Sequence, residues 1–341
     1  MLFEKNEYLS LRHELHFRPD GGFRILILTD PHGGTDCHPQ LKKGIDAIIA
    51  AAQPDLVLFG GDLTGCHIGC RTEEELRDYL ALITEIPEKR KIPWAHVYGN
   101  HDANLGISNA RQQRVFQSFP MCISKPGPDE IDGVGNYVLP VLNRSGEPAF
   151  NIWGLDTHND NACFCAEYGL PLDTKIILPE HTQMGYWSDS IRTNQLIWYW
   201  QTSEAIEKEF GRKIPGMMYM HIPLPEFCLI PRNPLETQMT GVMREHVGTN
   251  ELNPGLFAAC LQRGDIRAIF AGHDHLNDFC GDYCGIILGQ CAGINYDCGS
   301  CDDLRGGRVV ETHEDDPSKI NTYMLRLRDI LGADADNHLK R

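Results

Sequence analysis

Short apolar runs that end in polar clusters recur along this 341-residue chain. The runs have the length and composition of buried strands, and each is followed at once by Asp, Asn or His. The clusters are Asp30-Pro31-His32, Gly61-Asp62, Gly99-Asn100-His101-Asp102, His221 and Gly272-His273-Asp274-His275. Because ligands of α/β sheets bind beyond the carboxyl ends of the strands, the clusters predict a functional site at that edge.

The N-terminal part of the chain alternates strand and helix patterns. Strands are expected at Phe23–Thr29, Leu56–Phe59 and Trp94–Tyr98, and helices at Leu41–Ala52 and Thr72–Ile86. The second helix opens with a capping-box pattern. A β-α-β-α-β order is typical of a parallel sheet with crossover helices, so an α/β fold is predicted.

The remainder of the chain adds a hairpin, two helices and further strands. The hairpin is expected at Tyr137–Leu142 and Ala149–Leu155, the helices at Arg192–Phe210 and Pro254–Arg263, and strands at Gly216–Met220, Ile266–Ala271 and from Gly285 on. No Pro/Ser-rich linker divides the chain, so residues 1–341 are expected to form a single domain. Residues 157–190 show little periodicity, which indicates an insertion that shapes a pocket.

The charge balance limits the classes of partner. The chain has 31 Lys and Arg against 47 Asp and Glu, a net charge of −16. This excess of acid argues against binding to long nucleic acid or to an anionic membrane surface. The first residues are charged every few positions and lack the apolar segment of a secretory signal peptide. No apolar run in the chain is long enough to cross a bilayer. We therefore expect a cytoplasmic protein.

The 13 cysteines are an odd number in a long chain, which favours reduced thiols over a disulfide framework. Close pairs occur at Cys66/Cys70, Cys163/Cys165, Cys280/Cys284 and Cys298/Cys301. The last two pairs offer four ligands to a structural zinc ion. The stretch between those pairs has the pattern of a strand and a loop, which favours small buried thiols instead.

The residue types of the polar clusters indicate metal. Asp, Asn and His together suit Mn, Fe or Zn better than Ca. The clusters hold more ligands than one ion uses, whereas two ions about 3.5–4 Å apart that share a carboxylate use them all. A lone Asp or His after a strand is more simply a turn or a satisfied histidine, whereas Gly272-His273-Asp274-His275 alone is as well explained by metal as by a turn. Five of them at successive strand ends favour a dinuclear centre.

In order and spacing the clusters resemble the calcineurin-like metallophosphoesterase superfamily. Its pattern of D-x-H, G-D, G-N-H-[DE], a single H and G-H-x-H spans residues 23–276 here. The strings HIPLPEF, GLFAAC and AGHDHLNDFCG look like the branch of purple acid phosphatase 29-like and DCR2-like phosphatases. Purple enzymes have a metal-binding tyrosine at the position of Gly65 and a glycine at the position of His32. We therefore expect no tyrosinate ligand and no purple colour.

The resemblance implies a fold, a metal site and an activity. The fold would be a four-layer sandwich of two mixed β-sheets flanked by α-helices, α/β with an α+β part. Asp30, His32, Asp62 and His275 would hold one divalent ion, and Asp62, Asn100, His221 and His273 the other. His101 would act as proton donor, oriented by Asp102. A metal-bridging hydroxide would attack a small phosphate mono- or diester.

Several alternatives and weaker candidates remain open at this stage. A nuclease and a non-catalytic scaffold are the competing functions. Asp156, Thr157 and His158 are more simply a strand-ending turn than substrate-facing residues, whereas Glu226 is as well explained by a turn as by a role in a pocket. Asn277 and Asp278 are candidates to support His273 or His275, and Arg305 and Arg308 are more simply solvated at the surface than bound to phosphate.

Overall fold

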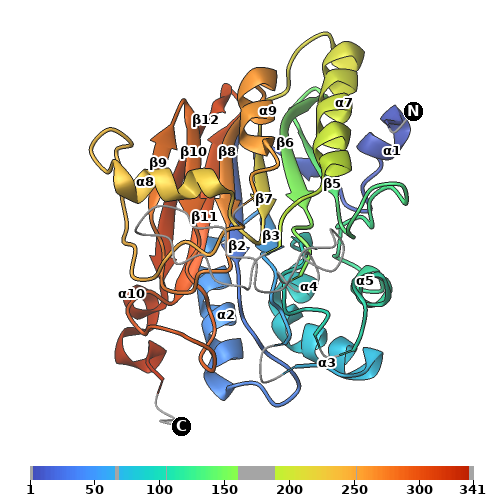
Figure 1. Cartoon of the computed structure of the whole chain (residues 1–341). Helices are drawn as coiled ribbons and strands as arrows, with labels where there is room; N and C mark the ends of the chain where they lie inside the picture. The colour runs from blue at the N-terminus through green and yellow to red at the C-terminus, as the bar shows by residue number, and fades with distance from the viewer. Residues whose placement is uncertain (1–2, 66–68, 105, 160–188, 251, 338–341) are drawn as a thin grey trace.

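The computed structural model describes residues 3–65, 69–104, 106–159, 189–250 and 252–337. Two mixed sheets pack face to face with helices on their outer sides, which is the predicted sandwich. Figure 1 shows α7 and α9 in the upper part of the view, beside the strands of the larger sheet, and α2 and α3 in the lower part. The insertion expected at 157–190 falls almost entirely outside the described residues.

The larger sheet has seven strands. Their order is β1 (Leu15–His16), β5 (Tyr137–Leu142), β6 (Pro148–Leu155), β7 (Gly216–Met220), β8 (Ile266–Ala271), β10 (Ile286–Gln290) and β9 (Cys280–Tyr283). Strand β7 lies at the centre, parallel to β6 and β8. The expected hairpin is the antiparallel pair β5 and β6.

The smaller sheet has five strands in the order β12 (Asp316–Arg326), β11 (Gly306–His313), β2 (Gly22–Leu28), β3 (Leu56–Phe59) and β4 (Trp94–His96). Strands β2, β3 and β4 are parallel, as the alternating pattern predicts, and β11 joins β2 antiparallel. The parallel strands bring the loops after β2, β3 and β4 to the same edge of the sheet.

Helices cover both outer faces. They are α1 (Lys5–Leu9), α2 (Pro39–Ala52), α3 (Glu73–Ile83), α4 (Glu85–Arg90), α5 (Asn109–Gln117), α7 (Thr193–Phe210), α8 (Leu229–Arg232), α9 (Leu256–Arg263) and α10 (Leu327–Leu331), with 3₁₀ turns at Pro225–Cys228 and Gly332–Ala335. Thr72 and Glu75 form the predicted capping box of α3. The single helix expected at Thr72–Ile86 is wrong: it breaks at Thr84, because Pro87 would clash with the carbonyl four residues earlier.

Strand β2 shows how the sequence builds the layers. Ile25 and Ile27 pack into the apolar layer between the sheets, whereas Leu26 and Leu28 belong to the cluster under α2 and α3. Both faces are apolar because a parallel strand in this position is covered on both sides.

Among the described residues, no helix is long and apolar enough to cross a membrane.

Candidate metal centre

All seven predicted metal ligands lie in loops that directly follow strands. Asp30 and His32 follow β2, Asp62 follows β3, Asn100 follows β4 by a few residues, His221 follows β7, and His273 and His275 follow β8. The first five are buried, and the two histidines after β8 are partly exposed. Both sheets therefore contribute ligands, and the centre lies where their strand ends meet.

The carboxylate of Asp62 lies between histidines of the two expected ligand sets. Its Oδ2 is 3.2 Å from Nε2 of His221 and 3.6 Å from Nε2 of His32. Its Oδ1 accepts a hydrogen bond of 2.8 Å from the backbone N–H of His101. One oxygen is thus held by the protein, and the other faces a histidine of each expected ligand set, a position suited to a carboxylate shared by two ions.

Asp30 tests whether these residues fit metal ions. Its Oδ2 accepts hydrogen bonds from Thr29 Oγ1 and the His273 N–H, whereas its Oδ1 is buried and has no hydrogen-bond partner. Three imidazole Nε2 atoms surround Oδ1, at 3.4 Å for His275, 3.7 Å for His221 and 3.8 Å for His32. A buried unsatisfied carboxylate oxygen is costly unless a cation coordinates it. The donor set therefore fits metal.

Backbone carbonyls fix the orientation of two histidines. The ring Nδ1 of His221 lies 2.8 Å from the Gly60 oxygen, and that of His275 lies 2.8 Å from the Cys298 oxygen. A carbonyl accepts only from a protonated ring nitrogen, so the other nitrogen, Nε2, is left as the ligand atom. His273 Nδ1 lies 2.9 Å from Asn100 Oδ1, which brings two expected ligands of one ion together.

Within the described residues, three groups of His, Cys, Asp and Glu have ligand atoms within 4.8 Å of one another. They are Asp30/His32/Asp62, Asp62/His221/His273 and His32/His275/Cys298. The first two correspond to the two expected ligand sets and share Asp62. The third contains Cys298, which the sequence pattern marks only as half of a close cysteine pair.

Four of the ligand residues have left-handed backbone. Asp30, His32, Asp62 and His273 have φ values of 53°, 43°, 49° and 72°. Each such residue costs about 1–3 kcal/mol and persists only where the surroundings enforce it. Only glycine fits at the neighbouring position 99, because a Cβ there would lie 2.2 Å from Asp62 Oδ1. Backbone strain thus concentrates at the centre.

The expected contact between Asp102 and the His101 ring is wrong. The Asp102 carboxylate accepts hydrogen bonds from the backbone N–H groups of Asp62, Thr64 and Gly99, at 3.0, 3.1 and 2.7 Å. The ring of His101 bonds instead to Asn104, with 2.8 Å between Asn104 Nδ2 and His101 Nδ1. In this tight turn Asp102 points inward and ties two loops together, whereas the half-buried His101 ring lies beside the ring of His32.

Burial and charge set the protonation of the centre. Burial lowers the pKa of His32 to about 4 and that of His273 to about 3, so both rings are neutral at pH 7. Burial also opposes charge on His221, but the carboxylates of Asp62 and Asp30 outweigh it and raise the pKa to about 10. The same attraction holds the pKa of Asp62 well below its usual range despite burial. The two carboxylates thus attract cations strongly.

Residues weighed as weaker candidates have other partners. Asn277 Oδ1 accepts from the backbone N–H groups of Arg244 and Glu245, and Asp278 pairs with Arg326. The surface position favoured for Arg305 and Arg308 is wrong, because they are only 1% and 2% exposed. Backbone carbonyls satisfy both guanidinium groups in the interior.

None of the ten cysteines in the described residues forms a disulfide, and Cys66, Cys163 and Cys165 lie outside those residues. The four-cysteine zinc site is not formed in the described part of the chain. Cys280 is buried and Cys284 exposed, whereas Cys298 faces His32 and His275.

The family model of the calcineurin-like phosphoesterases matches residues 23–277. The chain belongs to this family. It is 31% identical over 334 residues to probable inactive purple acid phosphatase 14 of Arabidopsis thaliana, covering 88% of this chain and 77% of the relative. It is 27% identical to phosphatase DCR2 of Saccharomyces cerevisiae, covering 76% of this chain and 45% of that protein. The predicted family and branch are therefore confirmed.

The fold is confirmed by a solved structure of the same architecture. A dimetal phosphatase from Danio rerio superimposes with a TM-score of 0.53 at 12% identity, covering 89% of this chain and 98% of that one. The backbone at Gly65, where the family resemblance places a tyrosine in purple enzymes, leaves no room for a side chain. Gly65 has a φ of 104°, and a Cβ there would lie 2.3 Å from the His101 oxygen.

Proposed function

We propose that this protein is a phosphoesterase that uses two divalent metal ions to hydrolyse a small phosphate mono- or diester. The observation that carries the proposal is the position of Asp62 Oδ2 between His221 and His32, beside the unsatisfied oxygen of Asp30. Turns or structural histidines do not require a buried carboxylate in that position. A pair of ions does.

The proposal divides the candidate ligands into the two sets that the family resemblance implies. Asp30, His32, Asp62 and His275 would hold one ion, and Asp62, Asn100, His221 and His273 the other. When bound, such ions act as Lewis acids that activate water and clamp phosphoryl oxygens. The mixture of carboxylate, amide and imidazole suits Mn, Fe or Zn.

His101 is the residue best placed to move a proton. The Asn104 amide donates to Nδ1 of His101, so the ring proton is on Nε2. From there it can be donated to a phosphoryl oxygen or to the leaving oxygen. Asp102 supports this role indirectly, because it holds the backbone of the loops that carry Asp62 and Gly99.

The net charge of −16 does not exclude an anionic substrate. Two divalent ions carry more positive charge than the carboxylates of Asp30 and Asp62 carry negative charge. The centre would therefore be positive where a phosphate binds. The charge of the rest of the chain still disfavours long nucleic acid. We therefore place the nuclease second, and cleavage of single- or double-stranded DNA in the presence of Mn²⁺ would reverse that order.

A panel of substrates and metals tests the proposal. We expect purified protein loaded in turn with Mn, Zn, Ni and Fe(II) to hydrolyse p-nitrophenyl phosphate or its bis ester. His221→Gln should abolish this activity, whereas His16→Gln should not, because His16 is exposed and its ring contacts the side chain of Glu14. Metal-loaded protein that hydrolyses neither ester would contradict the proposal.

A non-catalytic metal-binding protein is the competing function, because the plant relative is named a probable inactive phosphatase. In this chain, however, every ligand position of the motif is filled, and His101 stands beside the centre. The panel separates the two functions: both predict bound metal, and only the enzyme turns over ester.

A further inference from the structure

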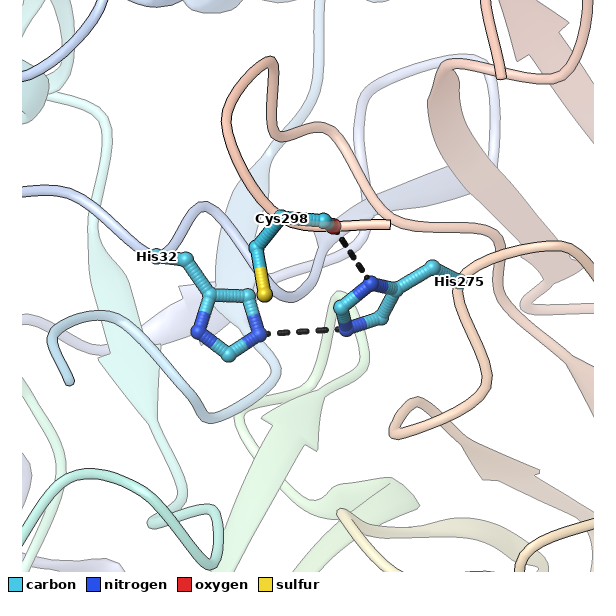
Figure 2. A group of neighbouring side chains, drawn as sticks. All are labelled: His32, His275 and Cys298. Atoms are coloured by element: carbon cyan, nitrogen blue, oxygen red, sulfur yellow. Dashed lines mark hydrogen bonds between the residues drawn. The ribbon is translucent and has the colours of Figure 1, made fainter. Parts of the chain in front are cut away.

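We infer that the thiolate of Cys298 is an additional ligand to the metal ion held by His32 and His275, an inference that rests on the proposed dinuclear centre. The ligand atoms of these three residues lie within 4.8 Å of one another. Figure 2 shows the Cys298 sulfur directed toward the space between the two imidazole rings. None of the motifs that define the metal site includes this cysteine.

The neighbouring groups point to a metal rather than to chance proximity. The Nε2 atoms of His32 and His275 are 3.1 Å apart. The unsatisfied, fully buried Oδ1 of Asp30 lies 3.4 Å from His275 Nε2. An imidazole pair and a carboxylate oxygen therefore converge where the sulfur is directed, and this donor set is typical of a zinc or iron ligand sphere.

Cys298 contributes to this site in two ways. Its backbone oxygen accepts from Nδ1 of His275 and so fixes the ring that presents Nε2 to the ion. Its Sγ approaches the same ion from the same loop. A thiol that binds metal gives its proton to the solvent and coordinates as thiolate.

The loop that carries Cys298 is built around a buried arginine. Arg305, which is 1% exposed, donates to the oxygens of Asn295, Asp302 and Ser300 and lies 3.8 Å from the ring centre of Tyr296. The Asn295 side chain in turn accepts from the backbone N–H of Cys298. The loop is thus held from within, and its cysteine is not a mobile surface thiol.

A thiolate ligand changes the metal preference of the centre. Soft sulfur ligands favour Zn, Cu(I) or Fe over Mn and Mg, which carboxylate and water suit. The site with Cys298 should therefore prefer Zn or Fe(II), whereas the other site keeps only O and N ligands. One ion of the pair would be more thiophilic than the other.

Cobalt spectroscopy tests the inference without measuring turnover. Wild-type protein loaded with Co²⁺ should show a thiolate-to-cobalt charge-transfer band in the near ultraviolet. Cys298→Ser should lose the band and bind Zn²⁺ about 10–100-fold more weakly. Changes to residues that only support a ligand already weaken metal binding by this factor, so loss of a ligand should weaken it at least as much. Cys301→Ser is the matched control, because its thiol contacts Asp303 and Arg244 instead, and it should retain the band.

The outcomes separate this inference from the proposed function. Two bound cobalt ions without a charge-transfer band, or a band that survives in Cys298→Ser, would overturn the thiolate ligand and leave the dinuclear enzyme standing. Failure to bind cobalt at all would contradict both. If Cys298→Ser does not fold, alkylation of wild-type protein decides: Zn²⁺ should protect Cys298 and not Cys301, and equal labelling of both would overturn the inference.

Discussion

Asp62 Oδ2 lies 3.2 Å from Nε2 of His221, and both residues are buried. In the proposed centre the carboxylate belongs to both ligand sets, whereas the imidazole belongs to one. Asp62 follows β3 of the smaller sheet, and His221 follows β7 of the larger. The pair therefore joins the two halves of the sandwich at the metal centre.

Removal of the shared carboxylate should empty both metal positions. We expect Asp62→Asn to lose both ions, because the amide keeps the shape of the side chain but not the charge that a bridging ligand supplies. Elemental analysis of the purified variant measures the loss. Asp334→Asn, which alters a carboxylate that is 73% exposed, should retain full metal content. A variant at position 62 that still holds two ions would refute the bridging role.

The proton-donor role of His101 predicts a loss of turnover without a loss of metal. His101→Ala should reduce kcat by roughly 10²–10⁴, the range for a general acid, and keep both ions. Asn104→Ala should reduce kcat less, by about 10–100-fold, because the variant loses the amide that orients the His101 ring but keeps the ring itself. Wild-type kcat in His101→Ala would exclude the role. A shifted pH profile in Asn104→Ala would separate orientation from a general loss of structure.

Asp102 should matter for stability more than for protonation of His101. Asp102→Asn replaces one carboxylate oxygen by an amide that cannot accept, so at least one of three backbone N–H groups loses its partner. The free energy of unfolding should fall by about 1–3 kcal/mol, as expected when a buried N–H group is left without a hydrogen-bond partner. Urea unfolding measures this. An unchanged unfolding midpoint with a displaced pH–rate profile would favour the direct contact with His101 instead.

His96 predicts a specific loss of stability in acid. It is 1% exposed and stacks on Phe116, and burial lowers its pKa from 6.5 to about 3. Between these two values the unfolded chain binds one more proton than the folded chain, so stability is lost as the pH falls. The loss is about 1.4 kcal/mol per pH unit. His96→Gln, compared with wild type after chelation of metal, should lack this component of the slope, and parallel slopes would disprove the assignment.

Gly65 should not tolerate a side chain. Gly65→Ala combines a left-handed φ with a clash against the His101 oxygen, whereas Gly106→Ala has a similar φ of 98° and nothing within 4 Å. The first variant should lose more unfolding free energy than the second, by about 1–3 kcal/mol, the range for overpacking. Thermal and urea unfolding of both variants measure the difference. Equal effects would show that only the backbone conformation matters there.

The convergence of the candidate ligands could be predicted because its signal in the sequence is local. Each ligand directly follows a strand, and parallel strands bring their carboxyl ends to one edge, so Asp30, Asp62 and His221 converge without knowledge of the loops. The apolar runs of β2, β3 and β7 are strong for the same reason, since both faces of each strand are covered.

What the sequence did not predict depends on contacts between distant segments. Arg305 and Arg308 resemble surface residues because nothing nearby in sequence reveals the carbonyls that surround their guanidinium groups. Asp102 follows His101 directly, yet two of the three backbone N–H groups that its carboxylate accepts from lie in the loop after β3. Cys298 reaches the centre only through the fold of a loop that links the two sheets.

The most direct measurement is a titration of metal-free protein with Zn²⁺ or Mn²⁺, with bound metal and the initial rate of ester hydrolysis followed together. A centre in which Asp62 bridges two ions predicts that the rate rises to a plateau at two bound ions per chain, and that Asp62→Asn shows neither binding nor rate. Protein that binds two ions and hydrolyses no phosphate ester, or that reaches its full rate with one, would contradict the account.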